Sequence, residues 1–166
     1  MFRNFGPRDL INLFREERRD VSSPVQSVEV SYFLQMTEDE ERVKRAVAVL
    51  LGRDPPVERE VLDGHFGNAI VWVRNHLTGE VAELALSEIV SHIDRTEVDA
   101  IIGDLESMID EHNALFLRLS KQVLVMRQSA VRSSADPIRV KLKPRSSMMK
   151  GDPVAFYAAM FRARPR

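Results

Sequence analysis

The sequence contains no cysteine, and this absence excludes disulfide bonds, cysteine nucleophiles and thiolate metal sites. It is also in keeping with a cytoplasmic protein, which is the location that we expect. Long hydrophobic runs are lacking as well, since each apolar run is much shorter than the roughly 20 residues that a membrane-spanning helix needs. The first residues, MFRNFGPRDLINLF, contain no uninterrupted apolar stretch of the kind found in signal peptides. The sequence therefore predicts neither a membrane span nor a secretory leader.

Catalytic and metal-binding motifs are missing too. The four histidines are scattered without the spacing of a zinc site, at positions His65, His76, His92 and His112. No GxSxG nucleophile elbow, Walker A motif or GxGxxG loop is present. We therefore predict no metal, no cofactor and no catalytic residue, and a non-enzymatic role is the favoured interpretation.

The charged residues, by contrast, are abundant and unevenly distributed. The 166 residues are 44% hydrophobic and 30% charged, which is typical of a soluble globular domain. Residues 1–113 contain 12 basic and 23 acidic side chains, whereas residues 114–166 contain 12 basic and 2 acidic ones. Such asymmetry indicates contact with nucleic acid or another anionic surface, although two halves that neutralise each other on folding would give the same pattern.

The spacing of apolar residues predicts the order of the structural elements. Period-two alternation predicts strands near residues 28–36, 57–62, 68–77, 115–119 and 138–143, with an optional strand before the last. Stripes at helical spacing predict helices after Thr37, from about Gly79, from Thr96 and after Pro153. This order predicts an α+β fold with a single mixed or antiparallel sheet and helices packed on one face.

Two of these helices begin with a sequence that resembles a capping box. In Thr37-Glu38-Asp39-Glu40, we expect the Thr37 hydroxyl to accept the Glu40 amide and the Glu40 carboxylate to reach back. This explains the acidic cluster without catalysis. The same interpretation applies to Thr96-Glu97-Val98-Asp99.

The stretch Gly64-His65-Phe66-Gly67-Asn68 lies between two predicted strands. Glycine and asparagine are the residues that adopt positive φ most readily, so the stretch is typical of a turn between antiparallel strands. We interpret it as structural, with His65 and Asn68 as exposed polar groups at the tip of the loop.

Four segments together resemble a known family. They are TEDEERVKRAV (37–47), GHFGN (64–68), LFLRLSKQ (115–122) and DPIRVKLK (136–143). In this order and spacing they resemble an archaeal family of small RNA-binding proteins described as predicted exosome subunits. The resemblance covers residues 25–144, and it implies a fold like that of the ribosomal protein that binds the small rRNA of the central protuberance. It implies no catalytic residue. The sequence departs from the family at Ser120-Lys121-Gln122, where an aspartate usually stands first and a glycine follows.

The last predicted strand alternates apolar and basic residues strictly. Its cations Arg139, Lys141 and Lys143 would project from one face of a sheet, where they suit phosphate contact with salt-dependent and largely sequence-independent affinity. A merely solvated outer face would show the same alternation. The candidate RNA contacts are Arg118, Lys121, Gln122, Arg139, Lys141, Lys143, His65 and Asn68. Aromatic residues are scarce, which argues against a sequence-reading sheet of the RRM type.

Two arms are expected to flank the domain. We predict an N-terminal arm at 1–24, an α+β RNA-binding-like domain at 25–145 and a C-terminal helical arm at 146–166. The C-terminal helix, capped by Asp152 and carrying Phe156, Tyr157 and Phe161, is expected to dock on a surface. That surface is a partner protein, a second copy in a homodimer, or its own domain. The alternative to RNA binding is therefore a protein-interaction or assembly module that docks through hydrophobic arms.

Overall fold

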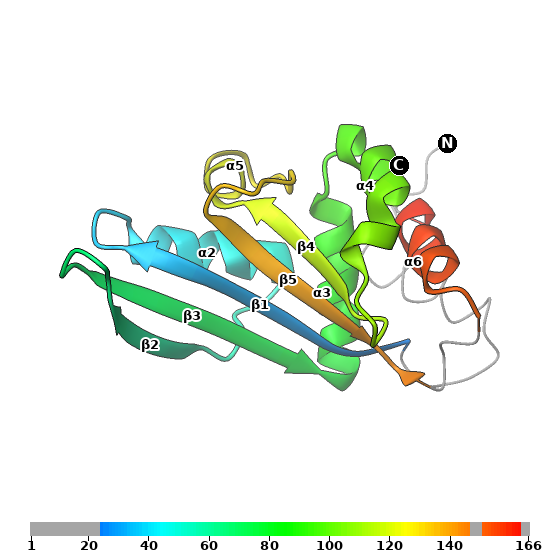
Figure 1. Cartoon of the computed structure of the whole chain (residues 1–166), viewed down its shortest axis with the longest axis horizontal. Helices are drawn as coiled ribbons and strands as arrows, with labels where there is room; N and C mark the ends of the chain where they lie inside the picture. Colours follow the sequence, from blue (N-terminus) through cyan, green and yellow to red (C-terminus); the bar gives the residue numbers. More distant parts are fainter. Residues whose placement is uncertain (1–23, 147–150, 164–166) are drawn as a thin grey trace.

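Five strands form one fully antiparallel sheet in the order β2-β3-β1-β5-β4 (Figure 1). The computed structural model describes residues 24–146 and 151–163. Its strands are β1 (Val25–Gln35), β2 (Glu58–Asp63), β3 (Ala69–Thr78), β4 (Leu115–Ser120) and β5 (Pro137–Pro144). The helices of this part of the chain are α2 (Glu40–Leu51), α3 (Gly79–His92), α4 (Arg95–Met108), α5 (Lys121–Arg127) and α6 (Pro153–Arg162). The predicted α+β class is confirmed.

Strand β1 lies at the centre of the sheet, between β3 and β5. Its alternation places four side chains in the core, namely Val28, Val30, Tyr32 and Leu34. The intervening side chains point to the other side of the sheet. Met36, the last residue of the strand predicted near 28–36, lies outside β1 and is 73% exposed.

The helices cover one face of the sheet. Figure 1 shows α2 and α3 behind the strands, with α4 and α6 together beyond the β4 edge. The stripe of α2 is buried as predicted, through Val43, Ala46, Val47, Leu50 and Leu51. Gly52 ends the helix at φ 69°, the left-handed conformation that glycine adopts without strain. The opposite face of the sheet carries no helix of the described chain, and below it is called the open face.

Both predicted capping boxes are wrong in detail. Helix α2 begins at Glu40 and is capped by Asp39, whose carboxylate accepts the Arg42 amide. Helix α4 begins at Arg95 and is capped by Asp94, which accepts the Thr96 amide. In each case an aspartate close to the expected threonine serves as the N-cap, and aspartate caps at least as well as threonine.

The optional strand before β5 does not exist in the described chain. Its place is taken by α5, a seven-residue helix capped by the Ser120 hydroxyl, which accepts the Val123 amide. Gln128 ends α5 at φ 53°. Residues 130–133 then return along the outer edge of β4, where the Ser120 amide donates to the Val131 carbonyl.

The C-terminal helix α6 packs against α4. Tyr157, Met160 and Phe161 are buried in the common core, and the Tyr157 hydroxyl donates to the Asn113 carbonyl at 2.6 Å. Of the three docking surfaces expected for this helix, the structure shows its own domain for residues 153–162. The N-terminal arm, residues 1–23, lies outside the described residues. None of the described helices is long and apolar enough to cross a membrane.

Candidate nucleic-acid interface

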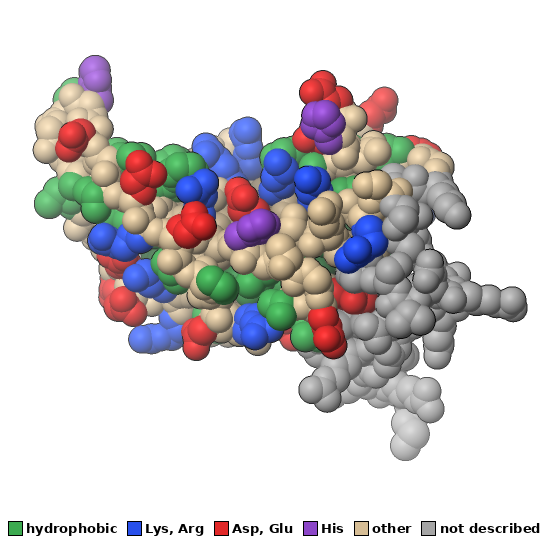
Figure 2. Space-filling view, turned by 90° about the horizontal axis from the view of Figure 1, so that it is seen from below, with side chains coloured by type: hydrophobic (Ala, Val, Ile, Leu, Met, Phe, Trp, Pro, Cys, Tyr) green, Lys and Arg blue, Asp and Glu red, His purple; other side chains and the backbone are tan. Residues whose placement is uncertain are grey.

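The register of the sheet aligns cations across the open face. Arg74 on β3 lies opposite Ser31 on β1, Ser31 lies opposite Arg139 on β5, and Arg139 lies opposite Arg118 on β4. Lys141 is the next residue of β5 on this face, and Lys143 follows it. Figure 2, turned by 90°, shows Lys and Arg side chains near the middle of the upper border of the molecule, with hydrophobic side chains and some Asp, Glu and His side chains around them. The open face is therefore predominantly basic at its β5 side.

Aromatic rings alternate with these cations. Phe33 and Trp72 are cross-strand neighbours whose rings stack with centroids 6.2 Å apart and planes 22° from parallel. The Arg74 guanidinium lies 4.3 Å from the Trp72 ring centroid, and the Arg139 guanidinium lies 5.6 Å from that of Phe33. The Lys141 ammonium lies 5.2 Å from the Phe116 ring. We call the row Arg74–Trp72–Phe33–Arg139 the stacked row.

Not all of these cations are neutralised by acids. The Arg74 guanidinium pairs with Glu58 on β2 at 3.1 Å. Among the described residues, Arg118, Arg139, Lys141 and Lys143 have no ion-pair partner within 4 Å. Side chains at such positions are available to phosphate groups.

The structure corrects the role of Lys121. This residue is 5% exposed, and its ammonium donates to Glu38 at 2.9 Å, to Asp136 at 2.6 Å and to the Phe33 carbonyl at 2.6 Å. The last residue pair of the β1–β5 ladder is Ser31–Arg139, so the Phe33 carbonyl lies beyond the end of β5 pairing. The Lys121 ammonium donates a hydrogen bond to this carbonyl in place of a β5 amide. Because its donors are fully occupied, Lys121 does not suit RNA contact and instead fixes the segment that carries Phe33.

Three other candidates lie away from the open face. Gln122 is exposed on α5, beside a pocket lined by Glu38 and Asp136. His65 and Asn68 are exposed in the turn between β2 and β3, at one end of the molecule. The turn has the predicted chemistry, with Gly67 at φ 76° and the Gly64 amide donating to the Asn68 carbonyl at 2.7 Å. The structure therefore does not bring these three side chains together with Arg139.

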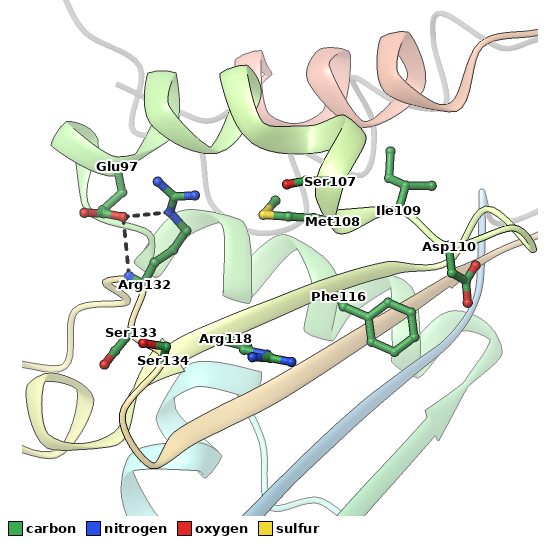
Figure 3. Close-up of a pocket in the computed structure, with 10 residues that line it drawn as sticks. All are labelled: Glu97, Ser107, Met108, Ile109, Asp110, Phe116, Arg118, Arg132, Ser133 and Ser134. Atoms are coloured by element: carbon green, nitrogen blue, oxygen red, sulfur yellow. Dashed lines mark hydrogen bonds and ion pairs between the residues drawn. The ribbon is translucent and has the colours of Figure 1, made fainter.

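A groove borders the open face along β4 (Figure 3). It has a volume of about 900 Å³ and separates the end of α4 from β4. Phe116 and Arg118 line it from β4, whereas Ser107 and Met108 line it from the end of α4. Ser133 and Ser134 line the end nearest α5.

One cation of the groove is already engaged. The Arg132 side chain binds Asp104 at 2.8 Å and Glu97 at 3.2 Å, and these carboxylates raise the pKa of the guanidinium. Arg132 therefore secures the 130–133 segment to α4. Within the described part of the chain, no three histidine or acidic side chains come together as a possible metal site.

The chain matches a family described as RNA binding over residues 27–144. The chain belongs to this family. The match includes all five strands except the first residues of β1, so the RNA-binding family model and the sheet cover nearly the same segment. No curated protein shows significant sequence similarity to the chain.

Solved structures of DUF54 proteins share the fold of this RNA-binding family member. A protein from Archaeoglobus fulgidus is 25% identical with a TM-score of 0.69, and the match covers 82% of this chain and 99% of that one. A protein from Methanothermobacter thermautotrophicus is also 25% identical, with a TM-score of 0.62 and coverage of 82% and 98%. A third, from Sulfolobus solfataricus, is 20% identical with a TM-score of 0.63 and coverage of 80% and 97%.

Sequence reasoning missed the aromatic side chains of the open face. Phe33, Trp72 and Phe116 occupy positions of their strands that alternate with buried residues, such as Leu34, Val73 and Leu117. This was the available signal, since a large aromatic residue on the polar side of a strand is unusual for a face left to solvent. The cross-strand register, which brings the rings beside the arginines, could not be read from one sequence.

Proposed function

We propose that the protein is a non-catalytic RNA-binding protein whose open face contacts structured RNA. The observation that carries this proposal is the interleaving of cations and aromatic rings on the face that the helices leave uncovered, within the segment matched by the RNA-binding family. Phosphates would bind Arg118, Arg139, Lys141 and Lys143. Exposed ring faces and guanidinium planes would contact bases or sugars.

The chemistry of the face favours low sequence specificity. Arginine and lysine contacts to phosphate fix position without reading bases, and stacking on Phe116 or on the stacked row accepts any base. Gln122, His65 and Asn68 are removed from the central contact set because of their positions. They remain peripheral candidates for an RNA long enough to pass the ends of the sheet.

The test is a titration with a structured RNA at several salt concentrations. The triple variant Arg139→Gln, Lys141→Gln, Lys143→Gln should weaken binding and reduce the slope of log affinity against log salt by about 3. The matched control replaces three exposed arginines on and after α2, Arg42, Arg45 and Arg53, on the helix-covered side. Equal affinity and slope in the two folded triple variants would contradict the proposal.

From the resemblance to predicted exosome subunits, we further propose that the protein associates with the archaeal exosome, an RNA-processing complex. This association is supported by the family resemblance alone, and a separate experiment tests it. Co-elution of the chain with a purified archaeal exosome in size-exclusion chromatography is expected. Separate elution would remove this part of the proposal and leave RNA binding intact.

The alternative function is a module that docks through hydrophobic arms, and the packing of α6 weakens it. The apolar residues of α6 are buried against its own domain and offer little surface to a partner.

A further inference from the structure

We infer that the groove beside β4 binds one unpaired nucleotide of an otherwise structured RNA. This inference rests on the proposed function and adds the class of RNA that the protein prefers. It depends on the groove, which the open face alone does not require.

The groove and the open face are continuous. Phe116 and Arg118 alternate with buried residues of β4, so they belong to the open face, and both also line the groove. A volume of about 900 Å³ is ample for a nucleotide, since small-molecule sites of about 300–1,000 Å³ are usual. An RNA strand that lies on the basic face can therefore direct a neighbouring nucleotide into the groove without leaving the sheet.

The lining of the groove offers a suitable contact for each part of a nucleotide. Phe116 is 41% exposed and presents a ring on which a base can stack, and Met108 provides an apolar wall. The Ser133 hydroxyl oxygen accepts the Ala135 amide, so its hydrogen is available to a base acceptor. The Ser107 hydroxyl donates to the Asp104 carbonyl, so its oxygen can accept from a base donor.

Charge places the phosphate at one side of the groove. Arg132 is held by Glu97 and Asp104, and Asp110 accepts the amides of His112 and Ala114. Arg118 is then the cation of this groove that has no ion-pair partner among the described residues. It lies opposite Arg139, so a phosphate bound between these two guanidinium groups would precede or follow the base on Phe116.

A base-paired nucleotide does not fit this description. Within a helix the ring faces are covered by neighbouring bases and the Watson–Crick edge is occupied, so stacking on Phe116 requires an unpaired base. A bulge or an unpaired end next to a duplex would satisfy the groove and the open face together.

The experiment compares two hairpin RNAs with identical stems, of which one carries a single bulged nucleotide. We expect the full-length chain to bind the bulged hairpin about tenfold more tightly, in the range that stacking of one base provides. Phe116→Leu keeps an apolar side chain but removes the ring, and should abolish the preference. Phe116→Tyr should retain it. The control is Phe66→Leu, since Phe66 is 91% exposed in the distant turn between β2 and β3.

A second variant guards against effects of Phe116 on folding. Ser134→Trp, at an exposed residue after β4, fills the groove without altering the sheet and should also abolish the preference. Equal affinity of the unmodified chain for the two hairpins would overturn the groove inference and leave the proposed function standing. If Phe116→Leu and Ser134→Trp lowered the affinity for both hairpins equally, the groove inference would also be overturned. Failure of the unmodified chain to bind either RNA would overturn both.

Discussion

Arg118 and Arg139 lie directly opposite one another on β4 and β5, and both are exposed on the open face. No acid of the described chain pairs with either guanidinium. Like charges at directly opposed positions of antiparallel strands destabilise the sheet. An anion bound between the two guanidinium groups would relieve this repulsion.

The first prediction follows from this repulsion. Arg118→Gln should raise the free energy of unfolding by about 0.5 kcal/mol, because the opposed charge is removed, while RNA affinity falls. Lys143→Gln is the control, because Lys143 lies opposite Ser27 on β1 and not opposite another cation. That variant should weaken RNA binding without a gain in stability. Urea unfolding and RNA titration measure both quantities, and a less stable Arg118→Gln protein would contradict the argument.

Substitution of Lys121 should lower the stability of the fold, whereas substitution of the surface cations should not. Lys121→Met removes the donor to Glu38, Asp136 and the Phe33 carbonyl, and should lower the free energy of unfolding by about 2 kcal/mol. Lys143→Met, at an exposed position, should stay within about 0.5 kcal/mol of the unmodified chain. If Lys121→Met instead left stability unchanged and reduced only RNA affinity, Lys121 would be an RNA contact after all.

The ion pairs of Glu40 should make the free energy of unfolding depend on pH in the acid range. Hydrogen bonds from Arg59 at 2.9 Å and from Lys44 at 3.0 Å lower the pKa of its carboxyl from 4.5 to about 2. A pKa that is lower in the folded chain contributes stability above the ordinary value, and this contribution is lost as the pH falls from 4.5 towards 2.

Glu40→Gln should therefore be less stable at neutral pH and should lose less stability on acidification. Urea unfolding at several pH values between 7 and 2 measures the difference. Glu41→Gln is the matched control, because the Glu41 side chain is 79% exposed, and it should follow the unmodified chain. Parallel pH curves for Glu40→Gln and the unmodified chain would show that the two ion pairs do not stabilise the fold.

The C-terminal helix should be needed for stability. Truncation after Ser146 removes Tyr157, Met160 and Phe161 from the core and should lower the melting temperature strongly. Tyr157→Phe removes the hydroxyl that donates to the Asn113 carbonyl at 2.6 Å and to the Leu142 carbonyl at 3.5 Å, and should cost about 1 kcal/mol. Ala159→Ser, on the exposed side of α6, is the control. An unchanged melting temperature after truncation would mean that α6 is not part of the cooperative core.

The buried faces could be predicted from sequence because their signal is local. Alternation placed Val30 and Tyr32 in the core, and helical spacing did the same for Val47 and Leu50. The start of α2 was misplaced because Asp39, two residues after the expected threonine, serves as the N-cap. Glu38, expected in the first turn, is instead engaged by Lys121 from 83 positions away. Helix α5 was missed because it is short and contains β-branched valines, which favour strands.

The arrangement of side chains on the open face was predicted only in part. Arg139, Lys141 and Lys143 share a strand, so their common face follows from period two. Phe33 and Trp72 come from different strands and meet only through the register of β1 and β3. Lys121 looked like a further cation because a sequence shows charge but does not show burial.

The two outer strands of the sheet have a consequence for self-association. Strand β2 is exposed along its length and begins with Glu58, Arg59 and Glu60. The outer edge of β4 is occupied near both ends, where the Asp110 amide donates to Ala114 and the Ser133 amide donates to Arg118. Charged or occupied edges discourage another molecule from adding a strand. The open face can therefore remain uncovered by helices while neither edge of the sheet offers a template for amyloid-like strand addition.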